Sequence, residues 1–183
     1  MNRTNWKIAE QSKQKMVQAL LTVMKQYDYK EITVTQIVQE AHLSRKTFYR
    51  MFSDKDEILN LFFQGLFQEF LEQVKENKIK HYWDLVQLYF DFWEEQKELL
   101  LLLQKNHLLP RVFEQSYQYS MEIFKFIRSK EIADSFALPL PYMLAYSVGG
   151  MHSMLLRWVE RGMDIPSSEL ISKLKSGFSS DDI

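Results

Sequence analysis

Basic and hydroxyl side chains gather between residues 33 and 55, and side chains of these types suit contact with a polyanion. Guanidinium and ammonium groups bind phosphates and the acceptor edges of bases, and hydroxyl groups donate hydrogen bonds to phosphate oxygens. The candidate contacts to double-stranded DNA in this stretch are Thr33, Thr35, Ser44, Arg45, Lys46, Thr47, Tyr49, Arg50 and Lys55. Within this set we expect two roles, with bases read by Arg45 and Lys46 and phosphates held by Thr35, Thr47, Tyr49 and Lys55.

Two short helices joined by a tight turn would present these side chains. Thr33, with Gln36 three residues later, predicts a capping box at the start of the first helix. Ser44 is placed to cap the second helix, which we expect to run from Arg45 to about Phe52. The order of helix, turn and basic helix is typical of a unit that reads DNA.

The second helix divides into an inner and an outer face. Phe48 and Phe52 lie four residues apart, a spacing that turns both rings inward and leaves the basic side chains outside. Eight residues at a rise of ~1.5 Å make a rod of roughly 12 Å, about the width of the major groove of B-DNA. A helix-turn-helix is also a general way to pack two helices, and a basic face is often only solvated. The pattern alone leaves both interpretations open.

A longer match favours DNA binding. The segments ITVTQIVQEA and LSRKTFYRMFSDKDEIL resemble the DNA-binding domain of the tetracycline-repressor (TetR) family of bacterial transcription regulators, over about residues 10 to 60. The resemblance implies sequence-specific binding to an operator by a homodimer. Two positions depart from the family pattern: His42 stands where members usually carry glycine in the turn, and Lys46 stands where small residues are common.

The whole chain is predicted to be all-α. Its 183 residues, 46% of them hydrophobic, suffice for a sizeable core. We expect an N-terminal three-helix helix-turn-helix domain over residues 1–54 and a C-terminal helical bundle for regulation and dimerisation over residues 55–183. Residues 1–60 hold ten basic and seven acidic residues, whereas residues 61–183 hold 13 and 17. A basic first third on an acidic remainder fits this division.

Catalytic and metal chemistry find no support in the sequence. The chain has no cysteine, and its four histidines, His42, His81, His107 and His152, are too far apart for a paired-histidine metal motif. We therefore expect no catalytic residue, no metal site and no cofactor. Neither a signal-peptide pattern nor a run of roughly 18 apolar residues is present, so we expect a cytoplasmic protein without a membrane partner.

Aromatic residues concentrate in the second part of the chain. Twenty of the 26 follow residue 60, and the segment YWDLVQLYFDFW (82–93) is apolar nearly all round. Such residues either fill a bulky core or line a ligand cavity, and composition does not choose between the two. The candidate contacts to a mostly apolar or aromatic ligand are Trp83, Tyr89, Trp93, Phe113, Tyr117 and Tyr146.

Small residues recur every four positions on the helix expected from Pro141 to about Arg161. Such a stripe lets a second helix approach closely. The segment YSVGGMHSMLLRWVERGMDIPSSELISKL is similar to the C-terminal region of a TetR subgroup that includes regulators of dihydroxyacetone-kinase operons. In the family the last two helices of each subunit pair into a four-helix dimer interface. The candidate interface residues are Ala145, Gly149, Gly150, Ser153, Leu170 and Leu174.

Together these features favour a sequence-specific, DNA-binding transcription regulator controlled by a small-molecule or protein effector at the C-terminal domain. Repression is the commoner mode in the family, but the C-terminal resemblance is to a subgroup with an activator in it. Two other classes stay open. One is a helical protein-interaction module, and the other is a small helical enzyme or carrier in which the helix-turn-helix serves only packing.

Overall fold

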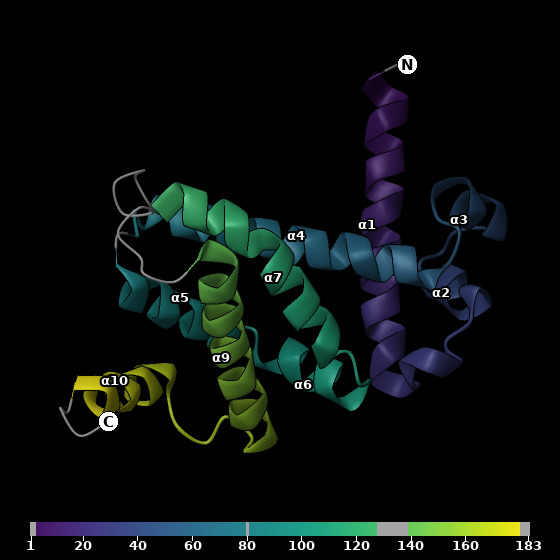
Figure 1. Ribbon diagram of the computed structural model, residues 1–183. Helices are drawn as coiled ribbons and strands as arrows, with labels where there is room; N and C mark the ends of the chain where they lie inside the picture. The colour runs from purple at the N-terminus through teal and green to yellow at the C-terminus, as the bar shows by residue number, and fades with distance from the viewer. Residues whose placement is uncertain (1–2, 80, 128–138, 180–183) are drawn as a thin grey trace. The chain divides into compact units, whose positions relative to one another are not determined.

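The computed structural model describes residues 3–79, 81–127 and 139–179, and every regular element in these ranges is a helix (Figure 1). The predicted all-α class is confirmed. The first elements are α1 (Arg3–Gln26), a 3-10 helix η1 (Tyr29–Glu31), α2 (Val34–Glu40), α3 (Arg45–Met51) and α4 (Lys55–Glu76). They are followed by α5 (Tyr82–Glu95), α6 (Lys97–Lys105), α7 (Leu109–Ile127), α9 (Leu140–Glu160) and α10 (Ser167–Ser179).

The chain forms two compact units. Unit 1 is Met1–Leu66 and unit 2 is Phe67–Ile183, so the division falls within α4. The sequence places a functional boundary earlier, between residues 54 and 55, which is where α4 begins. That boundary stays a prediction about which part of the chain works as a domain.

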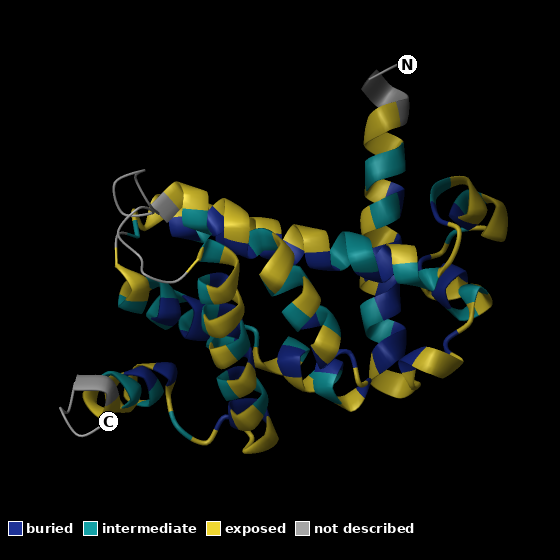
Figure 2. Ribbon diagram, in the orientation of Figure 1, coloured by how far each residue is buried: buried dark blue, intermediate teal, exposed yellow. Residues whose placement is uncertain are grey.

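Unit 1 has its core along the C-terminal half of α1. Met16, Leu20 and Met24 recur at helical spacing and are fully buried there, whereas the N-terminal half is mostly exposed (Figure 2). α2 packs against α1 and α3 packs against α2. Ile37 of α2 and Phe48 of α3 are buried completely. The apolar stripe of α1 thus supports the two short helices, which are too short to be stable alone.

Unit 2 is a helical bundle in which α7 packs along α9 and α10 packs along α5. Its centre is aromatic: Trp93 and Phe90 of α5 are fully buried, and the Phe90 ring lies 5.7 Å from the Trp158 ring of α9. The start of α10 is attached to α5 by Ser167, whose hydroxyl lies 2.6 Å from carboxylate oxygens of both Asp91 and Glu94. This contact orients the last helix.

No helix within the described ranges is long and apolar enough to cross a membrane. Nor do three or more histidine, aspartate or glutamate side chains of the described residues come together in a way that would hold a metal ion.

Candidate nucleic-acid interface

The start of α2 is closed by the capping box that the sequence predicts. The Thr33 hydroxyl oxygen accepts from the backbone N–H of Gln36 at 3.3 Å, and the Gln36 side-chain oxygen accepts from the Thr33 N–H at 2.8 Å. Both groups are otherwise unpaired donors at a helix start. The first helix of the motif therefore begins at a defined residue.

The turn between α2 and α3 is a Schellman motif. The N–H of His42 donates to Gln39 O at 3.1 Å, and the N–H of Leu43 donates to Val38 O at 2.9 Å. His42 has a φ of 52°, the left-handed conformation that glycine adopts most easily. The histidine at the family's glycine position therefore keeps the left-handed turn, at the cost of some strain.

Ser44 then starts α3. Its hydroxyl oxygen accepts from the backbone N–H of Thr47 at 3.1 Å and lies 2.9 Å from the Thr47 hydroxyl oxygen. Phe48 is fully buried and Phe52, the C-cap residue, is 5% exposed, so both rings lie in the core as expected. These two anchors fix which face of α3 is turned outward.

The outward face of α3 is basic. Arg45, Lys46 and Arg50 are exposed, and α3 contains no acidic residue. In the part of the chain that the structure describes, no salt bridge engages these three side chains. Their donors are therefore available to an external acceptor. Thr33, Thr35 and Ser44 are also exposed, while Thr47 is half-buried.

Tyr49 extends this surface. Its side chain is 54% exposed, and its ring lies beside the buried Phe48 ring in an edge-on contact with centroids 5.1 Å apart. The guanidinium carbon of Arg45 lies 5.9 Å from the Tyr49 ring centroid, within the range of a cation–π contact. The contact limits the rotamers of Arg45 at the N-terminal end of α3, where a base-reading side chain is needed.

Lys55 makes internal contacts at the start of α4. Its ammonium group donates to the carbonyl oxygens of Tyr29 at 2.6 Å, Lys30 at 3.0 Å and Ile32 at 2.8 Å. It also lies 4.8 Å from the Tyr29 ring centroid. An ammonium group has three protons, and all three are used here. The phosphate contact of Lys55 stays a prediction, and in this structure its ammonium protons have internal acceptors instead.

The surroundings of Lys55 explain this outcome. η1, which the sequence analysis did not anticipate, brings three carbonyl groups to the start of α4. The Tyr29 hydroxyl donates to Asp56 at 2.9 Å, which ties η1 to α4 a second time. Burial lowers the pKa of Lys55, and the carboxylates of Asp56 and Asp28 oppose that effect. The lysine thus positions η1 and α4 against each other.

Residues 11–61, which include α2, α3 and the turn between them, match the family model for bacterial regulatory proteins of the tetR family. This part of the chain is a helix-turn-helix domain of the TetR type. A curated relative, the HTH-type dhaKLM operon transcriptional activator DhaS of Lactococcus lactis subsp. lactis (strain IL1403), is 30% identical over 89 residues. The match covers 49% of this chain and 40% of that protein, so the chain spans less than half the length of this relative.

The TetR-family resemblance extends from the motif to its supports. The matched range begins within α1 and ends in the first turns of α4, so it contains the helices that hold the reading motif in place. The basic face of α3 is the part of this DNA-binding domain that can enter a major groove, because its N-terminal residues are exposed and unpaired within the described chain.

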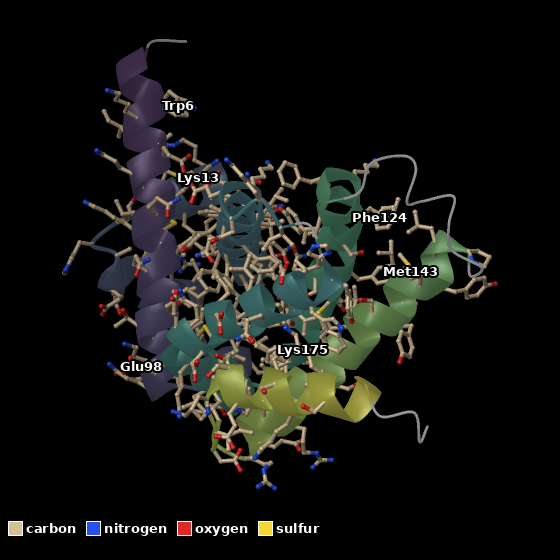
Figure 3. The ribbon with its side chains drawn as sticks, turned by 90° about the vertical axis from the view of Figure 1, so that its left-hand side faces the viewer. Trp6, Lys13, Glu98, Phe124, Met143 and Lys175 are labelled. Atoms are coloured by element: carbon tan, nitrogen blue, oxygen red, sulfur yellow. The ribbon has the colours of Figure 1, made fainter. Side chains whose placement is uncertain are left out.

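Unit 2 contains a cavity of about 400 Å³, a size typical of ligand pockets. Two of the six predicted ligand contacts, Tyr89 and Tyr146, line it. The cavity lies between α4, α5, α7 and α9, and its other lining residues are Phe67, Phe70, Tyr82, Leu85, Ser116, Ser120, Ile123, Phe124, Met143, Leu144, Ser147, Val148 and Met151. Figure 3 labels two of them, Phe124 on α7 and Met143 on α9.

The other four predicted ligand contacts lie outside this lining. Trp93 is completely buried in the core, and its ring lies 5.4 Å from the Phe92 ring. Phe113 packs 4.9 Å from the His152 ring, and Tyr117 is 43% exposed. Trp83 is half-buried beside Tyr82. The ligand role of these four residues stays a prediction, and this cavity does not support it: an aromatic helix that is apolar nearly all round gives no sign of which face meets a cavity.

The sequence of α7 contains a sign of the residues that line this cavity. Ser116 and Ser120 lie four residues apart in an otherwise apolar segment, which places two hydroxyl groups on one helical face. Both residues line the cavity. Hydroxyl groups at helical spacing on an apolar face indicated the residues that line the cavity better than the presence of large aromatic rings did.

The predicted dimer residues on α9 are open to solvent. Ala145, Gly150 and Ser153 are exposed and Gly149 is half-buried. A Cβ atom added at either glycine would meet no described atom within 4 Å. Leu170 and Leu174 of α10 are half-buried, while Ile171 between them is fully buried. Their interface role stays a prediction.

Proposed function

We propose that this TetR-family protein is a homodimeric transcription regulator that reads an operator through α3 and responds to an effector bound in unit 2. The observation that carries the proposal is the basic outer face of α3, with Arg45 and Lys46 exposed at the end of a helix capped by Ser44. Arginine and lysine are the side chains that most often pair with guanine O6 and N7 in the major groove.

The other exposed polar residues of the motif are placed for contacts with phosphates. Thr33, Thr35, Tyr49 and Arg50 are exposed around the rim of the motif, where hydroxyl and guanidinium groups suit phosphate oxygens. Lys55 is excluded from this group because its ammonium protons already have acceptors. Operator reading implies the compartment that holds the chromosome, so we place the protein in the bacterial cytoplasm.

Dimerisation follows from the way such motifs read DNA. A palindromic operator presents half-sites about one helical turn apart, ~34 Å, so two reading helices are needed at a fixed separation. The exposed small-residue stripe of α9 supports this helix, together with α10, as the contact between subunits. An effector can change DNA affinity only if it binds two dimer conformations unequally, with a coupling of ~1–3 kcal/mol as the usual scale.

The sign of regulation is proposed from the relative. The protein that matches 49% of this chain is named as an activator of the dhaKLM operon. We therefore take activation as the mode to test first, although repression is the commoner mode in the family. Placing the selected operator upstream of a reporter promoter decides the sign, because an activator raises transcription and a repressor lowers it.

The experiment that tests the proposal is selection of bound sequences from a random duplex pool. We expect enrichment of a palindrome whose half-sites are spaced by about one turn. Affinity for the selected duplex should fall steeply as salt rises, because bound phosphates release counterions. An unenriched pool, together with DNA retention that does not change with salt, would leave the interaction-module or enzyme classes as the better interpretation.

A further inference from the structure

The outward face of α3 places Arg45 and Tyr49 one helical turn apart. Residues four positions apart on an α-helix lie on the same face and can contact each other. Both side chains are exposed, and Arg45 is the first residue of α3, at the end from which base edges are read. The guanidinium carbon of Arg45 lies 5.9 Å from the centroid of the Tyr49 ring. The ring of Tyr49 is therefore placed to restrict where this arginine points.

The Tyr49 ring is itself held by the core of unit 1. Its contact with the Phe48 ring has centroids 5.1 Å apart and ring planes at 80°. Phe48 is completely buried, and its ring lies 5.9 Å from that of Phe52, which is 5% exposed. A chain of contacts thus runs from the core through Phe48 and Tyr49 to the guanidinium group of Arg45. The arginine is connected to close packing although its own side chain is exposed.

An aromatic ring holds an arginine without occupying its donors. In the part of the chain that the structure describes, Arg45 makes no salt bridge, and α3 has no acidic residue. A carboxylate in place of Tyr49 would bind the guanidinium N–H groups and compete with a base for them. The face of a ring attracts the cation through the ring quadrupole and needs no hydrogen-bond acceptor. The N–H donors therefore stay available to the O6 and N7 acceptors of a guanine.

Lys46 provides a contrast on the same helix. The residue four positions after it is Arg50, a second cation, and like charges at this spacing repel each other. Among the described residues, no aromatic ring is in cation–π contact with Lys46. The position of its ammonium group is therefore less restricted than that of the Arg45 guanidinium group, and we expect a less strict base preference from it.

From these contacts we propose that Tyr49 is a positioning residue for base reading: its ring holds the guanidinium group of Arg45 ready for a guanine in each operator half-site. The inference rests on the proposed operator reading and deepens it, because it names the base and the residue that makes its recognition strict. The ring acts through Arg45 and touches no base. The hydroxyl group of Tyr49 has a different task, because the phosphate contact expected of it is the same for every sequence.

Two substitutions separate the ring from the hydroxyl group. Tyr49→Phe keeps the ring, whereas Tyr49→Leu removes the ring but keeps an apolar side chain with good helix propensity. Arg45→Ala identifies the base pair concerned, as the position whose preference it relaxes. Dissociation constants of the full chain are measured by fluorescence anisotropy on the selected operator and on a duplex with that guanine replaced by adenine in both half-sites. The ratio of the two constants is the discrimination at this position.

The ring and the hydroxyl group should affect this ratio differently. Tyr49→Phe should keep the wild-type discrimination, because any change in affinity from the lost hydroxyl applies equally to both duplexes. Tyr49→Leu should reduce the discrimination roughly two- to fivefold, the effect expected when a solvent-exposed cation–π contact is lost. The preference at the other positions of the half-site should not change in either variant.

The Arg45→Ala background separates positioning from a general effect on the shape of α3. Without the guanidinium group nothing is left to position, so Tyr49→Leu should then change the discrimination at that base pair no further. Distortion of α3 would instead lower the preference at every position of the half-site, in either background. Tyr27→Leu, at an exposed tyrosine of unit 1 outside α2 and α3, is the matched control and should keep the wild-type discrimination.

The proposal is overturned if Tyr49→Leu retains the wild-type discrimination, if Tyr49→Phe loses as much of it, or if the base pair that Arg45 reads lacks guanine. An equal effect of Tyr49→Leu in the Arg45→Ala background would also overturn it. If Arg45→Ala relaxes no position, base reading by Arg45 is wrong and the positioning role fails with it. If Arg45→Ala relaxes one position and Tyr49→Leu relaxes none, only the positioning role is wrong.

Discussion

At the scale of single residues, two basic side chains of the DNA-binding domain differ in their surroundings. Arg45 is exposed, its guanidinium group makes a cation–π contact with the Tyr49 ring, and it makes no ion pair with a described residue. The ammonium group of Lys55 donates hydrogen bonds to the carbonyl oxygens of Tyr29, Lys30 and Ile32. Equal charge in the sequence therefore does not mean equal availability to DNA, and replacing each residue should produce a different defect.

Arg45→Ala should relax the base preference at one position of each half-site. We expect a loss of ~1–3 kcal/mol at that base pair, because a bidentate contact to a base edge is removed. Fluorescence anisotropy on the selected operator and on single-base variants measures the loss. Lys125→Ala removes the same charge from an exposed site on α7 and should leave the preference unchanged. Equal weakening of specific and random duplexes by Arg45→Ala would show that Arg45 does not read a base.

Lys55→Ala should lower stability rather than the salt dependence of DNA binding. Three carbonyl groups lose their donor, and a loss of roughly 1–3 kcal/mol in the free energy of unfolding is expected. Urea unfolding monitored by circular dichroism measures it. Lys30→Ala, an exposed neighbour of equal charge, is the control and should change stability little. A stable Lys55→Ala protein with a flatter salt slope would restore the phosphate role.

At the scale of helices, the ends are specified locally. α2 and α3 begin at Thr33 and Ser44, whose hydroxyl groups accept from backbone N–H groups. Chain reversal after α2 uses His42, and the same pattern recurs after α6 with His107, whose φ is 57°. Glycine adopts a positive φ at such positions with the least strain. Both histidines therefore adopt a left-handed conformation that is uncommon for residues other than glycine.

His152 connects α9 to α7 and should make unit 2 sensitive to acid. The residue is 9% exposed, its Nδ1 has no partner among the described residues, and its ring lies 4.9 Å from Phe113. Burial lowers the pKa of His152 below its ordinary value of about 6.5. As pH falls through 6.5 the unfolded chain takes up a proton that the folded chain resists, so the free energy of unfolding decreases.

His152→Gln cannot take up this proton and should make the free energy of unfolding less dependent on pH between 7 and the lowered pKa. Chemical unfolding at pH 7.5, 6.5 and 5.5 provides the comparison. His107→Gln, on an exposed residue, is the control and should follow the wild type. An unchanged slope in His152→Gln would mean that α7 and α9 accommodate the charged ring.

At the scale of the whole molecule, α9 serves two surfaces. Its residues Met143, Ser147 and Met151 line the cavity, while Ala145, Gly150 and Ser153 are exposed to solvent. Glycine within a helix costs about 1 kcal/mol relative to alanine, and no described atom of the chain approaches the glycines closely enough to require them. The proposed close approach of a second subunit would give a reason for their presence.

Gly150→Leu should stabilise the helix yet weaken the dimer. Leucine is a better helix former by somewhat less than about 1 kcal/mol, whereas a bulky side chain at a close helix contact costs ~1–3 kcal/mol. Sedimentation velocity over a range of concentrations should show more monomer than in the wild type. Gly65→Leu is the matched control, because Gly65 is also exposed on a helix with no described atom within 4 Å of an added Cβ. A dimer of undiminished affinity in Gly150→Leu would move the interface away from α9.

Local chemistry made the reading motif predictable from the sequence. The capping box at Thr33, the serine cap at Ser44 and the inward phenylalanines 48 and 52 depend on residues within four positions of one another. Such interactions form wherever the segment becomes helical, so periodicity and cap residues were enough to place α2, the turn and α3. The family match over residues 11–61 covers the same elements.

Only the tertiary structure determined which residues that are distant in the sequence contact each other. The ammonium group of Lys55 is engaged internally because η1, some 25 positions earlier, brings three carbonyl groups to it. Trp93 lies in the solid core while Tyr89, one turn before it, borders the cavity, and the difference comes from the packing of α4, α7 and α9 around α5. Helical spacing assigns a side chain to a face, but only the neighbouring helices determine whether that face meets solid core, cavity or solvent.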